Sequence, residues 1–261
     1  MSNASAHKTH GRYAWYELVT TDAAAARTFY GDVVGWRMQD SPMPGMTYTL
    51  LMTGDTQVGG LMPMPKAACD AGAKSGWVGY ISVDDVDAAA TKVQSLGGVL
   101  HQAPMDIPGV GRFAMVADPQ GATFNLFKSL QPGGASAPEA PGHIVWHELH
   151  TSDWPKAFGF YGAMFDWRKG DAIDMGGIGT YQLFNITDAV GGAMFNSPAA
   201  QQMPYWQYYF SVSDIDAAVK RVTAGGGRIM HGPQEVPSGN WIVQGADPQG
   251  ALFALHGKRA N

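Results

Sequence analysis

The chain has little of several residue types that mark particular classes of protein. Its 261 residues include a single cysteine, Cys69, so neither an internal disulfide nor a cysteine-based metal cluster is possible. Charged residues make up only 15%, the formal net charge is −5, and Lys and Arg form no run, which argues against nucleic acid as a partner. No apolar run approaches the roughly 18 residues of a membrane span, and residues 1–11 lack the apolar stretch of a signal peptide. We therefore expect a cytoplasmic protein without nucleic-acid or membrane partners.

Several catalytic motifs are also missing from the sequence. There is no Gly-x-Ser-x-Gly motif, no glycine-rich dinucleotide fingerprint and no Cys/His pair at ligand spacing, so hydrolase and dehydrogenase functions have no support. The hydrophobic content of 45% is, however, ample for two compact cores.

What the sequence does contain is an internal duplication. Residues 15–36 align without gaps with residues 146–167, and ten of the 22 positions are identical. The six residues 117–122 return unchanged as 246–251. Between the copies, residues 131–142 are rich in Pro, Gly and Ala, as in a linker. We expect two domains, 11–130 and 143–258, joined by this linker.

Each copy alternates between strand-like and helix-like segments. Aromatic and β-branched runs are followed by an Asp that fits a helix N-cap and then by Ala-rich stretches, at Asp22 and Asp85 in the first copy and at Asp153 and Asp214 in the second. Short strand candidates follow each helix. The pattern predicts an α+β fold of four βαβββ modules, paired into two cupped antiparallel sheets with the helices outside.

The same segments carry a family resemblance. The strand, Asp and helix leading to Phe-Tyr in residues 18–30, the helix start at 85–89 and the Asp-Pro-Gln-Gly turn at 118–121 resemble the vicinal oxygen chelate (VOC) superfamily. That superfamily contains glyoxalases, bleomycin resistance proteins and extradiol dioxygenases, and the motifs look most like a two-domain, glyoxalase-like branch. The resemblance implies paired βαβββ modules and, in the superfamily's enzymes, a divalent metal held by His, Gln or Glu.

The positions at which the resemblance places metal ligands do not carry the expected residues. In the first copy they are Trp15, Val78 and Asn125; in the second they are Trp146, Gln207 and Ala254. We therefore expect no metal cofactor of the family type. One alternative is a displaced site in the second domain formed by Glu148, His150 and His256.

A Trp-x-Glu sequence is the potentially chemical feature that both copies share. Strand alternation places Trp15 and Glu17 on one face, and Trp146 and Glu148 likewise. A carboxylate beside indole rings in a poorly solvated cleft is expected to have a raised pKa, which suits it to proton transfer. Glu17 and Glu148 are the predicted acid/base residues, although each Glu could instead only hold its sheet through hydrogen bonds. The predicted substrate-binding residues are Trp15, Tyr80, Asn125, Trp146, His150, Gln207, Tyr209 and His256.

These residues favour a glyoxalase-like protein that binds a small, partly apolar metabolite, with metal-independent lyase, isomerase or hydroxylase-like chemistry. Two alternatives remain open: a non-catalytic small-molecule binder like the bleomycin resistance proteins, and a metal-dependent dioxygenase or lyase that uses the displaced site. The sequence decides neither whether the protein is an enzyme nor whether it is a monomer or a homodimer.

Overall fold

A computed structural model describes residues 9–41, 47–131, 140–197 and 203–260. Most of the predicted linker, residues 132–139, lies outside this part. No helix within the described residues is long and apolar enough to cross a membrane.

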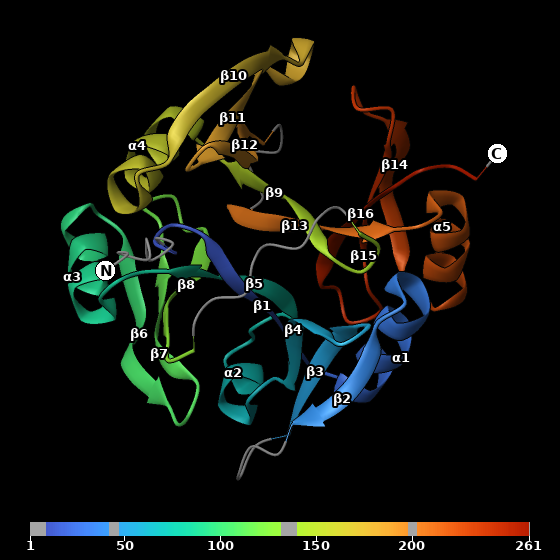
Figure 1. The fold of residues 1–261 in the computed structure, drawn as a ribbon, viewed down its shortest axis with the longest axis horizontal. Coiled ribbons are helices and arrows are strands. Elements are labelled where there is room, and N and C mark those ends of the chain that lie inside the picture. Colours follow the sequence, from blue (N-terminus) through green and yellow to red (C-terminus); the bar gives the residue numbers. More distant parts are fainter. Residues whose placement is uncertain (1–8, 42–46, 132–139, 198–202, 261) are drawn as a thin grey trace, which may run out of the picture. The chain divides into compact units, whose positions relative to one another are not determined.

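The predicted α+β class is confirmed, with four βαβββ modules in chain order (Figure 1). The first copy contains β1 (Tyr13–Thr20), α1 (Ala23–Val34), β2 (Arg37–Ser41), β3 (Tyr48–Thr53), β4 (Thr56–Pro63), a short α2 (Lys66–Asp70), β5 (Gly76–Ser82), α3 (Val86–Ser95), β6 (Val99–Ile107), β7 (Gly111–Ala117) and β8 (Thr123–Ser129). The second copy contains β9 (Ile144–Thr151), α4 (Trp154–Phe165), β10 (Arg168–Asp174), the 3₁₀ turn η1 (Gly176–Ile178), β11 (Thr180–Ile186), β12 (Ala189–Asn196), β13 (Tyr205–Val212), α5 (Ile215–Ala224), β14 (Arg228–Glu235), β15 (Trp241–Ala246) and β16 (Leu252–Gly257).

The four predicted Asp residues do cap the helices. The side chain of Asp22 accepts a hydrogen bond from the backbone N–H of Ala25, and Asp85, Asp153 and Asp214 cap α3, α4 and α5 in the same way. At the other end, α1 stops at Gly35 in the left-handed conformation, with φ 88°. The equivalent position in the second copy is Asp166, which takes the same conformation with φ 58°.

Each copy forms one eight-stranded sheet, in the orders β2-β3-β4-β1-β5-β8-β7-β6 and β10-β11-β12-β9-β13-β16-β15-β14. The prediction was of purely antiparallel sheets, but the sheets are mixed. Strand β1 runs parallel to β4, β5 to β8 and β13 to β16. The helix after a module's first strand returns the chain to its starting end. Two further reversals then leave the last strand running in the same direction as the first.

Packing divides the chain into two compact units that cut across the duplication. Unit 1 comprises the described residues within 1–14, 79–135 and 149–205, and unit 2 those within 15–78, 136–148 and 206–261. Unit 1 therefore combines most of the second and third modules, and unit 2 most of the first and fourth. The predicted domain boundaries follow the sequence repeats, whereas the compact units follow the modules.

A buried tyrosine–aspartate hydrogen bond holds each unit together. In unit 2, where α1 packs on α5 (Figure 1), the hydroxyl of Tyr30 donates to Asp247 Oδ2 at 3.1 Å and accepts from Trp77 Nε1 at 2.9 Å. The other oxygen of Asp247 accepts the backbone N–H groups of Gln249 and Ala251. The repeated Phe-Tyr and Asp-Pro-Gln-Gly motifs thus meet, one from each copy.

Unit 1 contains the same arrangement, but here the tyrosine comes from the second copy and the aspartate from the first. The hydroxyl of Tyr161 on α4 donates to Asp118 Oδ2 at 3.1 Å, and Asp118 Oδ1 accepts the N–H groups of residues 120–122. Both motifs therefore have a structural role in this fold.

Removal of the Asp247 carboxylate should destabilise the chain by at least about 2 kcal/mol, because Asp247→Ala leaves the Tyr30 hydroxyl and two backbone N–H groups without acceptors in a buried place. The unfolding free energy from urea titration measures this loss. The exposed Asp188→Ala is the matched control and should change it by less than about 0.5 kcal/mol. Equal effects of the two substitutions would contradict the proposed role.

The two buried aspartates also predict a pH dependence of stability. Burial raises the pKa of Asp118 and of Asp247 above the usual value, despite the lowering effect of their hydrogen-bond donors. The native state therefore keeps protons that the unfolded chain loses near pH 4, so this contribution to stability falls as the pH rises from about 4 toward neutrality. The measurement is the unfolding free energy of the wild type minus that of a D118N/D247N variant across this range. This difference in free energy should fall as the pH rises, and an increase would contradict the prediction.

Candidate functional site

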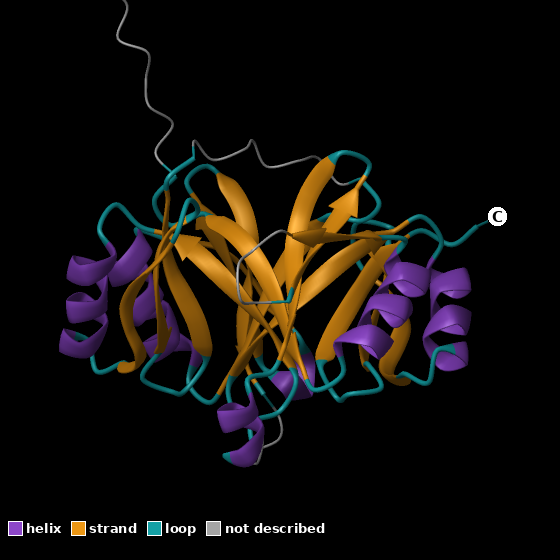
Figure 2. Ribbon diagram, turned by 90° about the horizontal axis from the view of Figure 1, so that it is seen from below, coloured by secondary structure: helices purple, strands orange, loops and turns teal. Residues whose placement is uncertain are grey.

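The sheets have one face covered by helices and one face without them (Figure 2). In unit 2, Phe253 on β16 packs against Phe29 and Tyr30 of α1, with ring centroids 5.6 and 5.8 Å apart. Since successive residues of a strand point to opposite faces, Ala254 lies on the helix-free face. Tyr209 on β13 pairs with Ala254 and shares that face.

Glu148 is the centre of a hydrogen-bonded triangle on this face of unit 2. Its side chain is only 5% exposed. Oε2 accepts from the hydroxyl of Tyr209 and Oε1 from Nε2 of Gln244, both at 3.1 Å. The Gln244 amide also donates to the Tyr209 hydroxyl at 2.7 Å, so three strands hold one carboxylate in a fixed orientation.

Gln244 is a site residue that sequence reasoning missed. It lies on β15, directly opposite Ala254 on β16, while Tyr209 flanks Ala254 on the other side. The small alanine side chain leaves the space across which Gln244 and Tyr209 meet. The sequence did show that Ala254 occupies a position at which the family has a metal ligand. It did not show that Gln244 lies opposite Ala254, because that depends on the register of β15 and β16.

Glu17 has a different set of neighbours, also within unit 2. Its Oε1 accepts from the hydroxyl of Tyr48 at 2.9 Å, and that hydroxyl accepts from Nε1 of Trp15 at 2.9 Å. Burial and the adjacent Glu17 charge raise the pKa of Tyr48 far above its usual range, so the phenol stays protonated and donates. Gly60, paired with Glu17 across β1 and β4, makes the room, because a Cβ there would overlap the Tyr48 hydroxyl.

The remaining predicted residues are placed as follows. Gln207, 3% exposed, donates from Nε2 to the backbone oxygen of Phe253 at 2.8 Å. His256 pairs with Ser211 across β16 and β13 in unit 2, and Trp146 is half-buried on β9. His150 belongs to unit 1, where its ring stacks on Tyr205 with centroids 4.4 Å apart. Tyr80 and Asn125 pair across β5 and β8, also in unit 1.

The side chains at the family's ligand positions do not fit a divalent metal. Within the described part of the chain, no three His, Cys, Asp or Glu side chains are grouped closely enough to hold an ion. Of the alternative set, Glu148 and His256 belong to unit 2 and His150 belongs to unit 1. At the family's own positions stand two tryptophans, Val78, Ala254 and the neutral amides of Asn125 and Gln207, a donor set too poor for a hard cation.

A cavity of about 420 Å³ opens in unit 2 at the carboxyl ends of β13 and β16. Ser211 and His256 line it, and this pair lies one step further along the helix-free face than Tyr209 and Ala254. Its other walls include the polar side chains of Ser238, Asn240 and Lys258.

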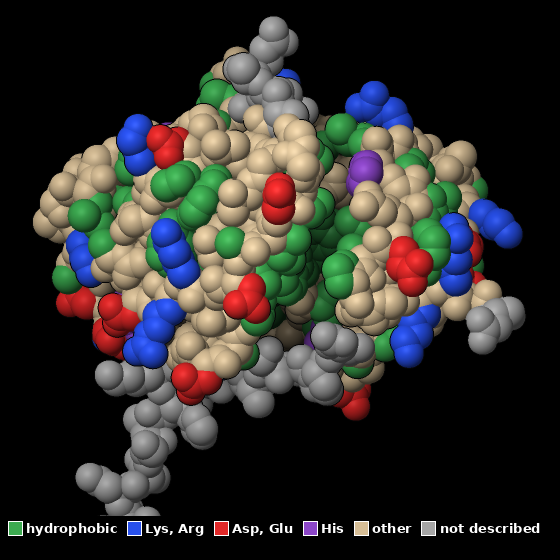
Figure 3. Space-filling model, turned by 90° about the horizontal axis from the view of Figure 1, so that it is seen from above, with side chains coloured by type: hydrophobic (Ala, Val, Ile, Leu, Met, Phe, Trp, Pro, Cys, Tyr) green, Lys and Arg blue, Asp and Glu red, His purple; other side chains and the backbone are tan. Residues whose placement is uncertain are grey.

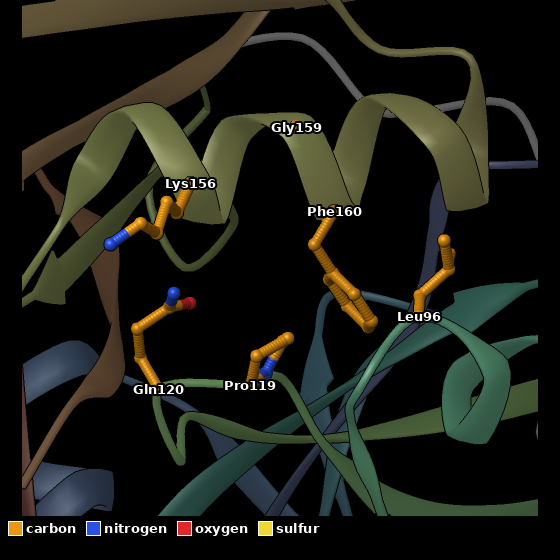
Figure 4. A pocket seen from close by; sticks show the side chains of 6 residues that line it. All are labelled: Leu96, Pro119, Gln120, Lys156, Gly159 and Phe160. Atoms are coloured by element: carbon orange, nitrogen blue, oxygen red, sulfur yellow. The ribbon is translucent and has the colours of Figure 1, made fainter.

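A smaller cavity, of about 290 Å³, belongs to unit 1 (Figure 4). Phe160, Gly159 and Lys156 of α4 form one wall, and Pro119 and Gln120 of the Asp-Pro-Gln-Gly turn form the other. None of the predicted site residues lines it. On the molecular face in Figure 3, Lys and Arg are scattered among Asp and Glu, and the described residues visible there form no continuous basic patch.

The family model of the Glyoxalase/Bleomycin resistance protein/Dioxygenase superfamily matches residues 12–126 and again residues 141–255. The chain is 32% identical to a protein named putative glyoxylase CFP32 from Mycobacterium tuberculosis, over 92% of each chain. It is 31% identical to the anthracycline biosynthesis protein DauV from Streptomyces sp. strain C5, over 94% of this chain and 92% of that one.

Two solved structures show the same fold at low sequence identity. The Mn(II)-bound glyoxalase from Novosphingobium aromaticivorans is 16% identical, with a TM-score of 0.66 over 97% of this chain and 83% of that one. Homoprotocatechuate 2,3-dioxygenase from Brevibacterium fuscum, in complex with 3,4-dihydroxyphenylacetate, is 18% identical, with a TM-score of 0.66 over 95% and 81%. With its two matched domains, the chain belongs to the Glyoxalase/Bleomycin resistance protein/Dioxygenase superfamily, the VOC superfamily that its motifs resemble.

Proposed function

We propose that the chain binds a small, partly apolar metabolite at Glu148 in unit 2, and that Glu148 transfers a proton there without a divalent metal. The observation that carries this proposal is the hydrogen-bonded triangle of Glu148, Tyr209 and Gln244. A buried carboxylate whose oxygens are both oriented by donors is suited to act as a general base at a fixed point.

The neighbouring groups support an isomerase-type reaction. Glu148 would take a proton from a carbon next to a ligand carbonyl, and the Tyr209 hydroxyl would turn from the carboxylate to the enolate oxygen that forms. When the ligand carries a C=C bond β,γ to the carbonyl, the enolate is a dienolate, and return of the proton to its γ-carbon shifts the C=C bond into conjugation with no net change of atoms. Trp146, two residues before Glu148 on the same strand face, supplies an aromatic wall for a planar ligand.

Glu17 is the second proposed acid/base residue. The hydroxyl of Tyr48, which is itself held by Trp15, donates a hydrogen bond to its carboxylate. The names of the relatives support aromatic ligands, since one is a protein of anthracycline biosynthesis and one structural neighbour binds 3,4-dihydroxyphenylacetate.

A non-catalytic binding protein is the second candidate function. It is favoured by the fact that both oxygens of Glu148 already accept hydrogen bonds within the protein, an arrangement that would also serve only to hold three strands together. Both candidate functions predict ligand binding, but only the enzyme changes its ligand. A measurement of turnover therefore distinguishes them.

Glu148→Gln should reduce proton exchange by at least about a hundredfold while ligand affinity changes little, because the amide keeps the shape but cannot act as a base. Binding is screened by ligand-induced melting shifts with aromatic ketones and phenolic acids, including 3,4-dihydroxyphenylacetate. The reaction is followed by NMR as deuterium uptake into the carbon–hydrogen bonds of each hit in D₂O.

Glu17→Gln is measured in parallel, because Glu17 is the second proposed acid/base residue. If Glu17→Gln abolishes exchange and Glu148→Gln does not, the active carboxylate is Glu17. Bound ligands that take up no deuterium with the wild type would argue for a pure binding protein. Loss of exchange on dialysis against EDTA would contradict a metal-free mechanism.

A further inference from the structure

We propose a second ligand site on the helix-free face of unit 1, at which Asn125 binds an uncharged, planar molecule that presents an N–H and a C=O group side by side, as a lactam or carboxamide does. This site does not depend on the function proposed for Glu148. The two carboxylates and Asn125 lie in different units.

The proposal starts from an unusual side chain. Asn125 is 1% exposed, yet neither its amide nitrogen nor its amide oxygen has a hydrogen-bond partner among the residues that the structure describes. Buried amides are almost always paired, because an unpaired donor or acceptor loses its hydrogen bonds to water without replacement. An unpaired donor and acceptor in one side chain indicate a partner from outside the protein.

The strand geometry gives the direction of the side chain. The preceding residue, Phe124, packs on α4 with its ring centroid 5.5 Å from Tyr161 and 5.8 Å from Phe165. Asn125 therefore points to the opposite, helix-free face of β8. Its cross-strand neighbours on that face are Tyr80 on β5 and Met115 on β7.

The surroundings of Asn125 define the chemical class of the ligand. Two residues further along the same face, Phe127 pairs with Phe113, and both rings contact Tyr80, with centroids 5.7 and 6.2 Å away. None of these neighbours carries a carboxylate, an amine, a guanidinium or an imidazole group, so a charged ligand would lose its hydration without compensation. Aromatic rings around a single amide instead fit a flat, neutral ring system.

Access and hydrogen-bond pattern complete the assignment. Phe113 and Met115, beside Asn125 on this face, are only partly buried, so the neighbouring part of the face reaches solvent. The Asn125 oxygen accepts one hydrogen bond and its nitrogen donates another, and a cyclic lactam edge satisfies both at once. Ketones, phenols and ethers satisfy the side chain only in part.

The second copy does not contain this site. The residue equivalent to Asn125 is Ala254, which has no polar side-chain atom and borders the Glu148 triangle instead. The two copies therefore differ at the same strand position, one with a neutral amide and the other with space for a carboxylate network.

The test uses 2-quinolinone, a planar lactam, with the full-length protein and isothermal titration calorimetry. We expect saturable binding by the wild type and at least tenfold weaker binding of 1-methyl-2-quinolinone, which lacks the N–H group but keeps the ring. Asn125→Leu, similar in size but apolar, should weaken 2-quinolinone binding at least tenfold. It should also leave the melting temperature of the free protein unchanged or higher, since it removes an unpaired buried amide.

Glu148→Gln is the control that separates the two sites, and it should leave 2-quinolinone affinity unchanged. The proposal is overturned if the wild type shows no saturable binding up to the solubility limit, if the methylated analogue binds equally well, or if Glu148→Gln abolishes binding. If Asn125→Leu fails to fold, the comparison of the two quinolinones on the wild type still tests the proposal, because equal affinities would overturn it.

Discussion

The hydrogen bond between a helix tyrosine and a turn aspartate is the interaction on which the rest of the structure depends. It occurs as Tyr30 with Asp247 and as Tyr161 with Asp118. In each case the phenol comes from one copy of the duplicated sequence and the carboxylate from the other. The carboxylate also accepts hydrogen bonds from the backbone N–H groups of its own turn. One side chain therefore fixes both the turn and the helix that packs on it. This packing covers one face of the strands with helices and leaves the other face without them.

Much of the fold could be predicted because local signals coincide in this chain. Asp at the helix starts and the alternating strand and helix segments indicate the order of elements. The structure adds the hydrogen bond between Glu148 and Tyr209. The regrouping of modules into compact units was not predictable from the duplication. Similar sequences in both copies do not reveal which halves pack together, since that depends on contacts between residues of different copies, 43 positions apart in unit 1 and 217 in unit 2.

The candidate site was predicted less completely than the fold. Glu17 and Glu148 are buried as expected, but Tyr48 and Gln244 reach them only through cross-strand register, which the sequence does not specify. Gly60 illustrates the difficulty. A paired glycine in a strand indicates a close approach, yet nothing in the pattern identifies the Tyr48 ring as the group that approaches.

The exchange of partners between the copies has a consequence for how such a chain arises. A single repeat carries both a Phe-Tyr helix and an Asp-Pro-Gln-Gly turn, but in this fold neither motif is satisfied within its own repeat. An ancestor with one repeat would therefore have buried Tyr30 and Asp118 only by associating with a second copy of itself, each subunit supplying what the other needed. Within one chain that association is intramolecular and independent of protein concentration. The two halves can also differ from each other, as Asn125 and Ala254 do at the equivalent strand position.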